Sequence, residues 1–157
     1  MQKAHLETTN NIWHPFTQMQ LEPFTVPINK AKGAVLYGED GKEDIDANAS
    51  WWTNTHGHCH PHVVKAIQGQ AAELDHVIFA GFTNPRAVSL SEKLLDLVDD
   101  SYKKVFFSDN GSTSIEVAIK MVYQYWYNQG VTKKRILALH GAYHGDTFGA
   151  MSVGERG

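Results

Sequence analysis

The most constraining feature of this 157-residue chain is a strand, loop, helix and strand pattern in its second half. An apolar run at residues 105–108 leads into the small polar sequence SDNGST, and apolar residues then recur at helical spacing over 113–128. Gly130 ends that stretch before a second apolar run at 135–139. Such a βαβ unit is normally a right-handed crossover between parallel strands, so the pattern predicts an α/β fold.

The first part of the chain predicts an arm and a β-hairpin. Residues 1–30 contain three prolines, which remove backbone donors and disfavour a long helix, so we interpret them as an irregular arm. Residues 34–46 hold two strand-like runs around Asp40-Gly41, a pair suited to the positive φ angles of a tight turn.

Two helices are predicted between the hairpin and the βαβ unit. Pro61 suits the first turn of a helix over 61–74, and Asn84-Pro85 repeats that signal for a helix to about residue 98. Apolar residues at helical spacing predict that the second helix has a buried face: Ala87, Leu90, Leu94, Leu97 and Val98.

Charge and cysteine content exclude several classes of protein. Fourteen Lys and Arg against 17 Asp and Glu give a formal net charge of -3, without the basic excess that a nucleic-acid partner requires. No apolar run approaches the roughly 20 residues that span a bilayer. Cys59 is the single cysteine, so an internal disulfide framework is excluded. We expect a soluble, cytoplasmic protein.

The SDNGST loop has two interpretations. Thr113 and Glu116 have capping-box spacing, so the loop can be merely a well-capped helix start. A helix start after a strand also presents free backbone N–H groups and a positive dipole end to a phosphate, with the Ser112 and Thr113 hydroxyls as added donors.

A second loop is expected near the first. The sequence HGAYHGDTFGAMS at 140–152 follows the second apolar run and carries Tyr143, His144 and Asp146. Ligands of open α/β sheets collect beyond the carboxyl ends of the strands, where both loops would lie. We therefore expect the two loops to converge.

Two further groups are less specific. His56, His58, His60 and His62 surround Cys59 and can be a zinc site, but Gly57 and Pro61 interrupt the regularity, and capping or turn hydrogen bonds explain such residues equally well. Trp51 and Trp52 are either core residues or the wall of a substrate pocket.

Several motifs together resemble one known family. Their sequence is similar to the N-terminal part of the biotin-pathway branch of the class III, fold-type I pyridoxal-phosphate aminotransferases. The motifs are WHPFTQM at 13–19, SWW at 50–52, HGHCHP at 56–61, SDNGSTSIEVAIKM at 108–121, QYW at 124–126 and YHGDTFGAMS at 143–152.

The resemblance implies roles for five residues. Gly111 and Ser112 match the pair that binds the phosphate of pyridoxal 5'-phosphate, and Tyr143 matches the aromatic residue that stacks on its ring. Trp51 matches a residue that lines the substrate pocket. Phe16 stands near the substrate where a known family member has Tyr, so a potential hydrogen bond is lost.

The resemblance also implies an activity. It is the conversion of 8-amino-7-oxononanoate to 7,8-diaminononanoate in biotin biosynthesis, with S-adenosylmethionine as the expected amino donor and lysine as the substitute that Phe16 leaves open. The family is homodimeric, with a site shared across the dimer. Residues 1–50 would be the arm and hairpin of a small domain, and 51–157 the start of the large cofactor-binding domain.

Family members are more than twice as long as this chain. Their Schiff-base lysine matches no lysine of residues 1–157, so we expect no catalytic residue here and no activity from these residues alone. Three alternatives stay open: another class III omega-aminotransferase, a non-catalytic fragment that binds a phosphate ligand, and a metal-binding protein that uses the histidine cluster.

Overall fold

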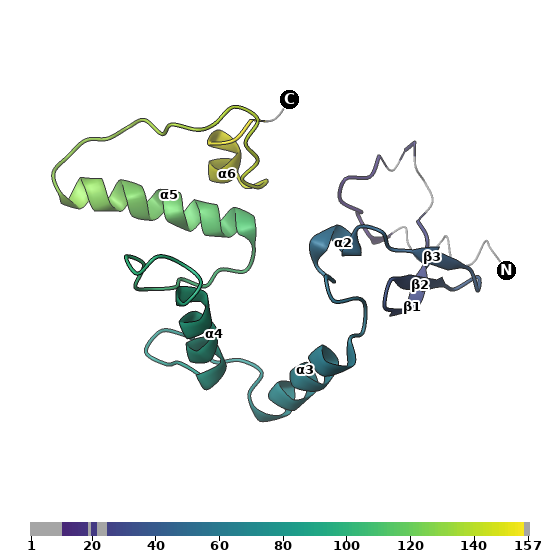
Figure 1. Cartoon of the computed structure of the whole chain (residues 1–157). Coiled ribbons are helices and arrows are strands. Elements are labelled where there is room, and N and C mark those ends of the chain that lie inside the picture. Colours follow the sequence, from purple (N-terminus) through teal and green to yellow (C-terminus); the bar gives the residue numbers. More distant parts are fainter. Residues whose placement is uncertain (1–10, 19, 22–24, 156–157) are drawn as a thin grey trace. The chain divides into compact units, whose positions relative to one another are not determined.

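The computed structural model describes residues 11–18, 20–21 and 25–155 (Figure 1). The chain divides into two compact units, Met1–Ile78 and Phe79–Gly157. Much of the predicted arm, namely residues 1–10, 19 and 22–24, lies outside the described residues. No helix within the described ranges is long and apolar enough to cross a membrane.

The first unit contains a three-stranded antiparallel sheet. Its strands β1 (Ile28–Lys32), β2 (Val35–Gly38) and β3 (Glu43–Ile45) pair in the order β1-β2-β3. The predicted hairpin is confirmed as β2 and β3. The prediction that residues to 30 are irregular is wrong at its end, because β1 begins at Ile28 and pairs with β2. The third strand, β1, therefore stabilises the hairpin, because two strands alone are only marginally stable in water.

The turn between β2 and β3 differs in detail from the prediction. Gly41 has a φ of 83°, whereas Asp40 is not among the described residues with positive φ. The Asp40 side chain instead accepts a hydrogen bond from the Lys42 backbone N–H at 3.1 Å. One glycine and one aspartate side chain thus close this turn.

A short turn of opposite hand follows the sheet. The four residues of α2 (Ala49–Trp52) all have positive φ, between 49° and 65°. This element is a left-handed turn, which costs L-amino acids roughly 1–2 kcal/mol per residue. The sequence predicted no element here, because none of its residues favours that conformation.

Two helices begin where the prolines predicted. Pro61 is the first residue of α3 (Pro61–Glu73), and Asn84 caps α4 (Pro85–Leu95) by accepting the Ala87 N–H at 2.9 Å. The helix α4 ends before the predicted position near residue 98.

The predicted buried face of α4 is wrong. Among its members, Leu90 is 49% and Leu94 39% exposed. Within the second unit only α5 and α6 pack together among the described elements, so no described helix or strand covers α4.

The second unit places its longest helix beside a short one. Helix α5 (Gly111–Asn128) is close to the predicted 113–128, and α6 (Phe148–Ser152) lies within the predicted loop. Ala150 of α6 is the one buried apolar residue among those described. The segments 105–108 and 135–139 are not strands, so that prediction is wrong. A parallel strand is stabilised by hydrogen bonds to neighbouring strands, and neither segment pairs with a described strand.

Candidate functional site

The start of α5 is fixed by a reciprocal capping box. Asn110 Oδ1 accepts the Thr113 N–H at 2.9 Å, and Thr113 Oγ1 accepts the Asn110 N–H at 3.2 Å. The predicted box between Thr113 and Glu116 is therefore wrong by one turn. Asn110 is the better cap because its amide oxygen reaches the third N–H of the helix directly.

Thr113 is committed to the protein rather than to a ligand. Its hydroxyl donates to Asp109 Oδ1 at 2.6 Å. This hydrogen bond is the largest cause that holds the pKa of Asp109 below its ordinary value of 3.8. The expectation that Thr113 adds a donor to a phosphate site is not met by this geometry.

Gly111 and Ser112 remain suited to an anion. A Cβ built on Gly111 would meet nothing within 4 Å, so packing within the described residues leaves open space there. Ser112 Oγ accepts the Asp146 N–H at 3.1 Å, and an oxygen that accepts still has its own proton to donate. This helix start therefore fits a phosphate, with open space beside Gly111 and the Ser112 hydroxyl next to it.

The loop at 140–152 meets the α5 start, as predicted from the sequence. Besides the Asp146 N–H contact, the Tyr143 hydroxyl donates to Asp146 Oδ2 at 3.1 Å. A Cβ on Gly145, whose φ is 118°, would overlap the Ser112 side chain and stand 2.7 Å from Ser112 Cα. Asp146 thus links Tyr143 to Ser112, and Gly145 permits the close approach.

Glu116 makes the second connection between α5 and this loop. Its Oε1 accepts the Gly149 N–H at 2.6 Å and the Ala150 N–H at 3.3 Å. The Thr147 side chain first, and these N–H groups next, lower the pKa of Glu116. Gly149 leaves no room for a side chain, because a Cβ there would overlap the Glu116 carboxylate.

The two predicted substrate residues come together in the first unit. The rings of Phe16 and Trp51 lie edge to face with centroids 5.0 Å apart and an interplanar angle of 65°. Both side chains are largely exposed, at 72% and 58%. They form a small aromatic surface that an amphipathic substrate can cover.

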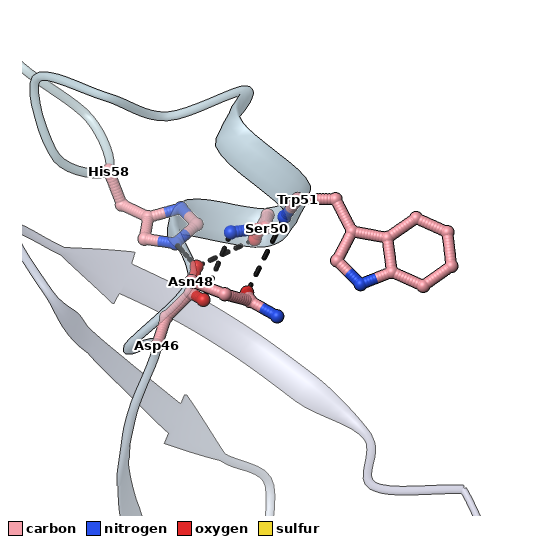
Figure 2. Close-up of polar contacts among 5 residues, drawn as sticks. All are labelled: Asp46, Asn48, Ser50, Trp51 and His58. Atoms are coloured by element: carbon pink, nitrogen blue, oxygen red, sulfur yellow. Dashed lines mark hydrogen bonds and ion pairs between the residues drawn. The ribbon is translucent and has the colours of Figure 1, made fainter. Parts of the chain in front are cut away.

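A largely buried carboxylate, that of Asp46, contacts the backbone next to Trp51 (Figure 2). Asp46 accepts the Ser50 N–H at 3.0 Å, the Ser50 hydroxyl at 2.7 Å and His58 Nε2 at 2.7 Å. The side chains of Asp46 and His58 are only 6% and 15% exposed. The Ser50 backbone and hydroxyl, followed by His58, lower the pKa of Asp46 to about 2. Asp46 is therefore ionised at neutral pH and can only accept, so His58 Nε2 carries a proton.

The histidine cluster shows no metal-site geometry. His58 is bound to Asp46, and the rings of His56 and His60 face each other edge to face at 6.3 Å. No group of three His, Cys, Asp or Glu residues among those described is arranged to hold a metal ion.

The predicted site residues thus form two groups. Phe16 and Trp51 lie in the first unit, and Gly111, Ser112 and Tyr143 lie in the second.

Sequence reasoning missed the contacts of Asp46 and Glu116. Asp46 follows a strand and precedes Ser50 by four residues, and a carboxylate at such a position signals a local side-chain cap. Glu116 gave a capping signal that was assigned to the wrong helix.

Comparison with known proteins identifies the family. Residues 16–157 match the family Aminotransferase class-III. A Synechococcus elongatus protein named adenosylmethionine-8-amino-7-oxononanoate aminotransferase is 53% identical over 146 residues, which are 93% of this chain and 34% of that protein. The chain belongs to the class III aminotransferase family. It spans about a third of the length of the curated relatives it matches.

Solved structures agree with this family. The Methanocaldococcus jannaschii adenosylmethionine-8-amino-7-oxononanoate aminotransferase is 35% identical with a TM-score of 0.91, covering 98% of this chain and 36% of that one. An amine transaminase from an uncultivated Pseudomonas species, described in its PLP-bound form, is 32% identical with a TM-score of 0.83, covering 92% and 34%. The predicted fold class, the N-terminal portion of a fold-type I transferase, is confirmed, and so is pyridoxal 5'-phosphate as the cofactor of this class of enzyme.

Proposed function

We propose that this chain is the N-terminal portion of an aminotransferase that converts 8-amino-7-oxononanoate to 7,8-diaminononanoate in biotin biosynthesis. The observation that carries the proposal is the 53% identity to a relative named for that activity, which extends over 93% of the chain. S-adenosylmethionine, which the relative's name includes, is the proposed amino donor. The protein would act in the cytoplasm as a homodimer.

In this proposal the second unit binds the cofactor. The N–H groups at the α5 start and the Ser112 hydroxyl would hold the phosphate, and Gly111 would allow its close approach. Tyr143, which is 66% exposed, would stack on the pyridine ring while Asp146 holds its hydroxyl. Bound pyridoxal phosphate supplies the electron sink that makes amino transfer possible.

The first unit would bind substrate. Trp51 would line the pocket of the amino acceptor, with Phe16 against its edge. Phe16 has no hydroxyl, so any recognition of the donor at this position is apolar, which is the reason to test lysine beside S-adenosylmethionine. Residues 1–50 would belong to a small domain and 51–157 to the large one.

The activity is tested on protein made from the complete reading frame and loaded with pyridoxal phosphate. We expect 7,8-diaminononanoate to form from 8-amino-7-oxononanoate when S-adenosylmethionine is present, and a parallel reaction with lysine identifies the donor. A matched pair, Tyr143→Ala and Tyr102→Ala, should show a loss only for Tyr143, because alanine removes the ring that stacks. Failure to consume 8-amino-7-oxononanoate with either donor would refute the assignment.

The lysine residue that bonds to the cofactor has a separate test. No lysine of residues 1–157 is the cofactor-bonding lysine in this proposal, and the chain alone would be inactive. Borohydride reduction followed by peptide mapping should find no labelled lysine within these residues. A stoichiometric adduct at any of them would contradict this expectation.

A second candidate function is transamination of other amines. The likeness to the PLP-bound amine transaminase favours it, since that structure is 32% identical to this chain. A panel of amino acceptors separates the two functions: turnover of simple ketones with indifference to 8-amino-7-oxononanoate would favour the general amine transaminase.

A further inference from the structure

The left-handed turn α2 needs an explanation outside its own sequence. Four successive residues with positive φ include Ser50 and two tryptophans, and none of them is glycine, asparagine or aspartate. Backbone of this kind persists only where surrounding contacts over-determine it, and it is concentrated at binding and active sites.

Beside two backbone hydrogen bonds, from Trp52 N–H to Asn48 O at 3.0 Å and from Asn54 N–H to Ala49 O at 2.9 Å, the turn is held by the Asp46 side chain. One carboxylate binds both the backbone N–H and the hydroxyl of Ser50, the second residue of the turn. Asn48 adds a weaker contact, with its Oδ1 3.4 Å from the Trp51 nitrogen. Charge-assisted hydrogen bonds are about twice as strong as neutral ones, so Asp46 is the strongest side-chain constraint on the turn.

Both ends of the segment are tied to the sheet. The Asp46 N–H donates to Ala34 O at 2.9 Å, and His58 exchanges two backbone hydrogen bonds with Gly33, at 2.8 and 3.0 Å. Asp46 and His58, twelve positions apart, are then joined through their side chains. Gly33 and Ala34, adjacent between β1 and β2, thus anchor both ends of the loop that carries α2.

We propose that Asp46 and His58 are positioning residues, which hold the left-handed turn Ala49–Trp52 and thereby set where the Trp51 ring stands beside Phe16. Figure 2 shows the Trp51 indole pointing away from the carboxylate, so Asp46 acts on it through the backbone. The effect on substrate rests on the proposed function, in which Trp51 lines the amino-acceptor pocket.

The first test measures the turn itself. Amide hydrogen exchange is followed in protein from the complete reading frame, in wild type and in Asp46→Asn. Loss of the charged acceptor should speed exchange at the Ser50 amide about tenfold or more, with α5 unchanged. The matched control is Asp44→Asn, the same substitution at an exposed position of β3, which should leave exchange at Ser50 unchanged. Unchanged exchange in Asp46→Asn would overturn the proposal.

The second test separates positioning from folding. His58→Gln keeps an N–H donor near the Nε2 position, whereas His58→Leu removes it. We expect His58→Leu and Asp46→Asn to raise KM for the amino acceptor about tenfold with kcat changed less than about threefold, because misplaced Trp51 weakens binding throughout the reaction. His58→Gln should restore most of the loss. Faster exchange at Ser50 without any rise in KM would refute the positioning role.

The two proposals fail in different ways. Kinetics use whichever acceptor the wild-type protein turns over, with 8-amino-7-oxononanoate tried first. Rejection of that compound by the wild type counts against the proposed function alone. The exchange measurement needs no substrate, so it decides whether Asp46 holds the turn in either case.

Discussion

The two candidate site regions are held together in different ways. In the first unit, Asp46 gathers partners that are four and twelve positions away, and the strained turn is built from neighbouring residues. In the second unit, the contacts of Ser112 and Glu116 join positions 33 or 34 residues apart. One region is local and strained, and the other depends on bringing a distant loop onto a helix.

The difference concerns what each site requires in order to form. A local polar cluster closes a short loop and then carries backbone strain as its main cost. The distant loop of the second unit must return across residues 129–140, which contain no helix or strand. Its attachment depends on small residues that permit close contact, so its sensitivity to substitution should lie at glycines rather than at charges.

The largest expected effect is at Gly145. An alanine there combines an unfavourable φ of 118° with overlap of the Ser112 side chain. We expect Gly145→Ala to reduce the free energy of unfolding by about 2–5 kcal/mol, measured by urea denaturation.

Gly141→Ala is the matched control for Gly145→Ala. Gly141 also has positive φ, at 71°, but its Cβ would meet nothing within 4 Å. Strain alone should cost about 1–2 kcal/mol. Equal losses at the two glycines would mean that the close contact with Ser112 contributes nothing.

A smaller, local effect is expected at Glu116. Glu116→Ala leaves the Gly149 and Ala150 N–H groups without their acceptor, so their exchange should accelerate about tenfold. In Glu116→Gln, which keeps one oxygen, the exchange rates of these amides should lie between those of the wild type and Glu116→Ala. The control Glu92→Ala removes an exposed glutamate of α4 and should leave both amides unchanged. Slow exchange in Glu116→Ala would show that the loop is held by other contacts.

Acid should loosen the turn that Asp46 holds in the first unit. The pKa of Asp46 is about 2 in the folded chain against an ordinary value of 3.8. A lowered folded pKa means that its stabilisation is complete above the unfolded value and is lost as pH falls through about 2. Near-ultraviolet circular dichroism of the tryptophans should report this loss, and Asp46→Asn should lack it. A wild-type titration that matches the variant over pH 5 to 2 would contradict the assignment.

The smallest effect on stability is expected at Gly111. Its Cβ has open space, so Gly111→Ala should leave the unfolding midpoint nearly unchanged. The same methyl group would obstruct a phosphate, so the affinity for pyridoxal phosphate should fall, which an absorbance titration measures. Loss of stability without loss of affinity would remove Gly111 from the cofactor site.

Sequence alone was a good guide where one residue dictates the backbone. Pro61 and the Asn84-Pro85 pair fixed two helix starts, and the α5 start followed from a small polar loop. Prediction from the sequence failed where an element needs a second segment to pair with. Residues 105–108 and 135–139 have strand-like composition, but a strand exists only with a partner to bond.

The site was predictable to a similar degree. The convergence of Ser112 with the loop at Asp146 was predicted and their hydrogen bond confirms it, although the parallel strands from which it was predicted do not form. The pairing of Asp46 with His58 was not predictable, because a spacing of twelve positions through a left-handed turn has no periodic signature. The roles of Gly111, Ser112, Tyr143, Trp51 and Phe16 in binding remain predictions.

The handedness of α2 limits how this surface can be redesigned. Any residue placed at position 51 must accept a φ near 54°. β-Branched residues are the least tolerant of that backbone, whereas glycine, asparagine and aspartate accept it. Libraries that vary Trp51 should therefore be weighted toward side chains compatible with the turn. A failed variant there can reflect a lost backbone conformation rather than an unsuitable pocket.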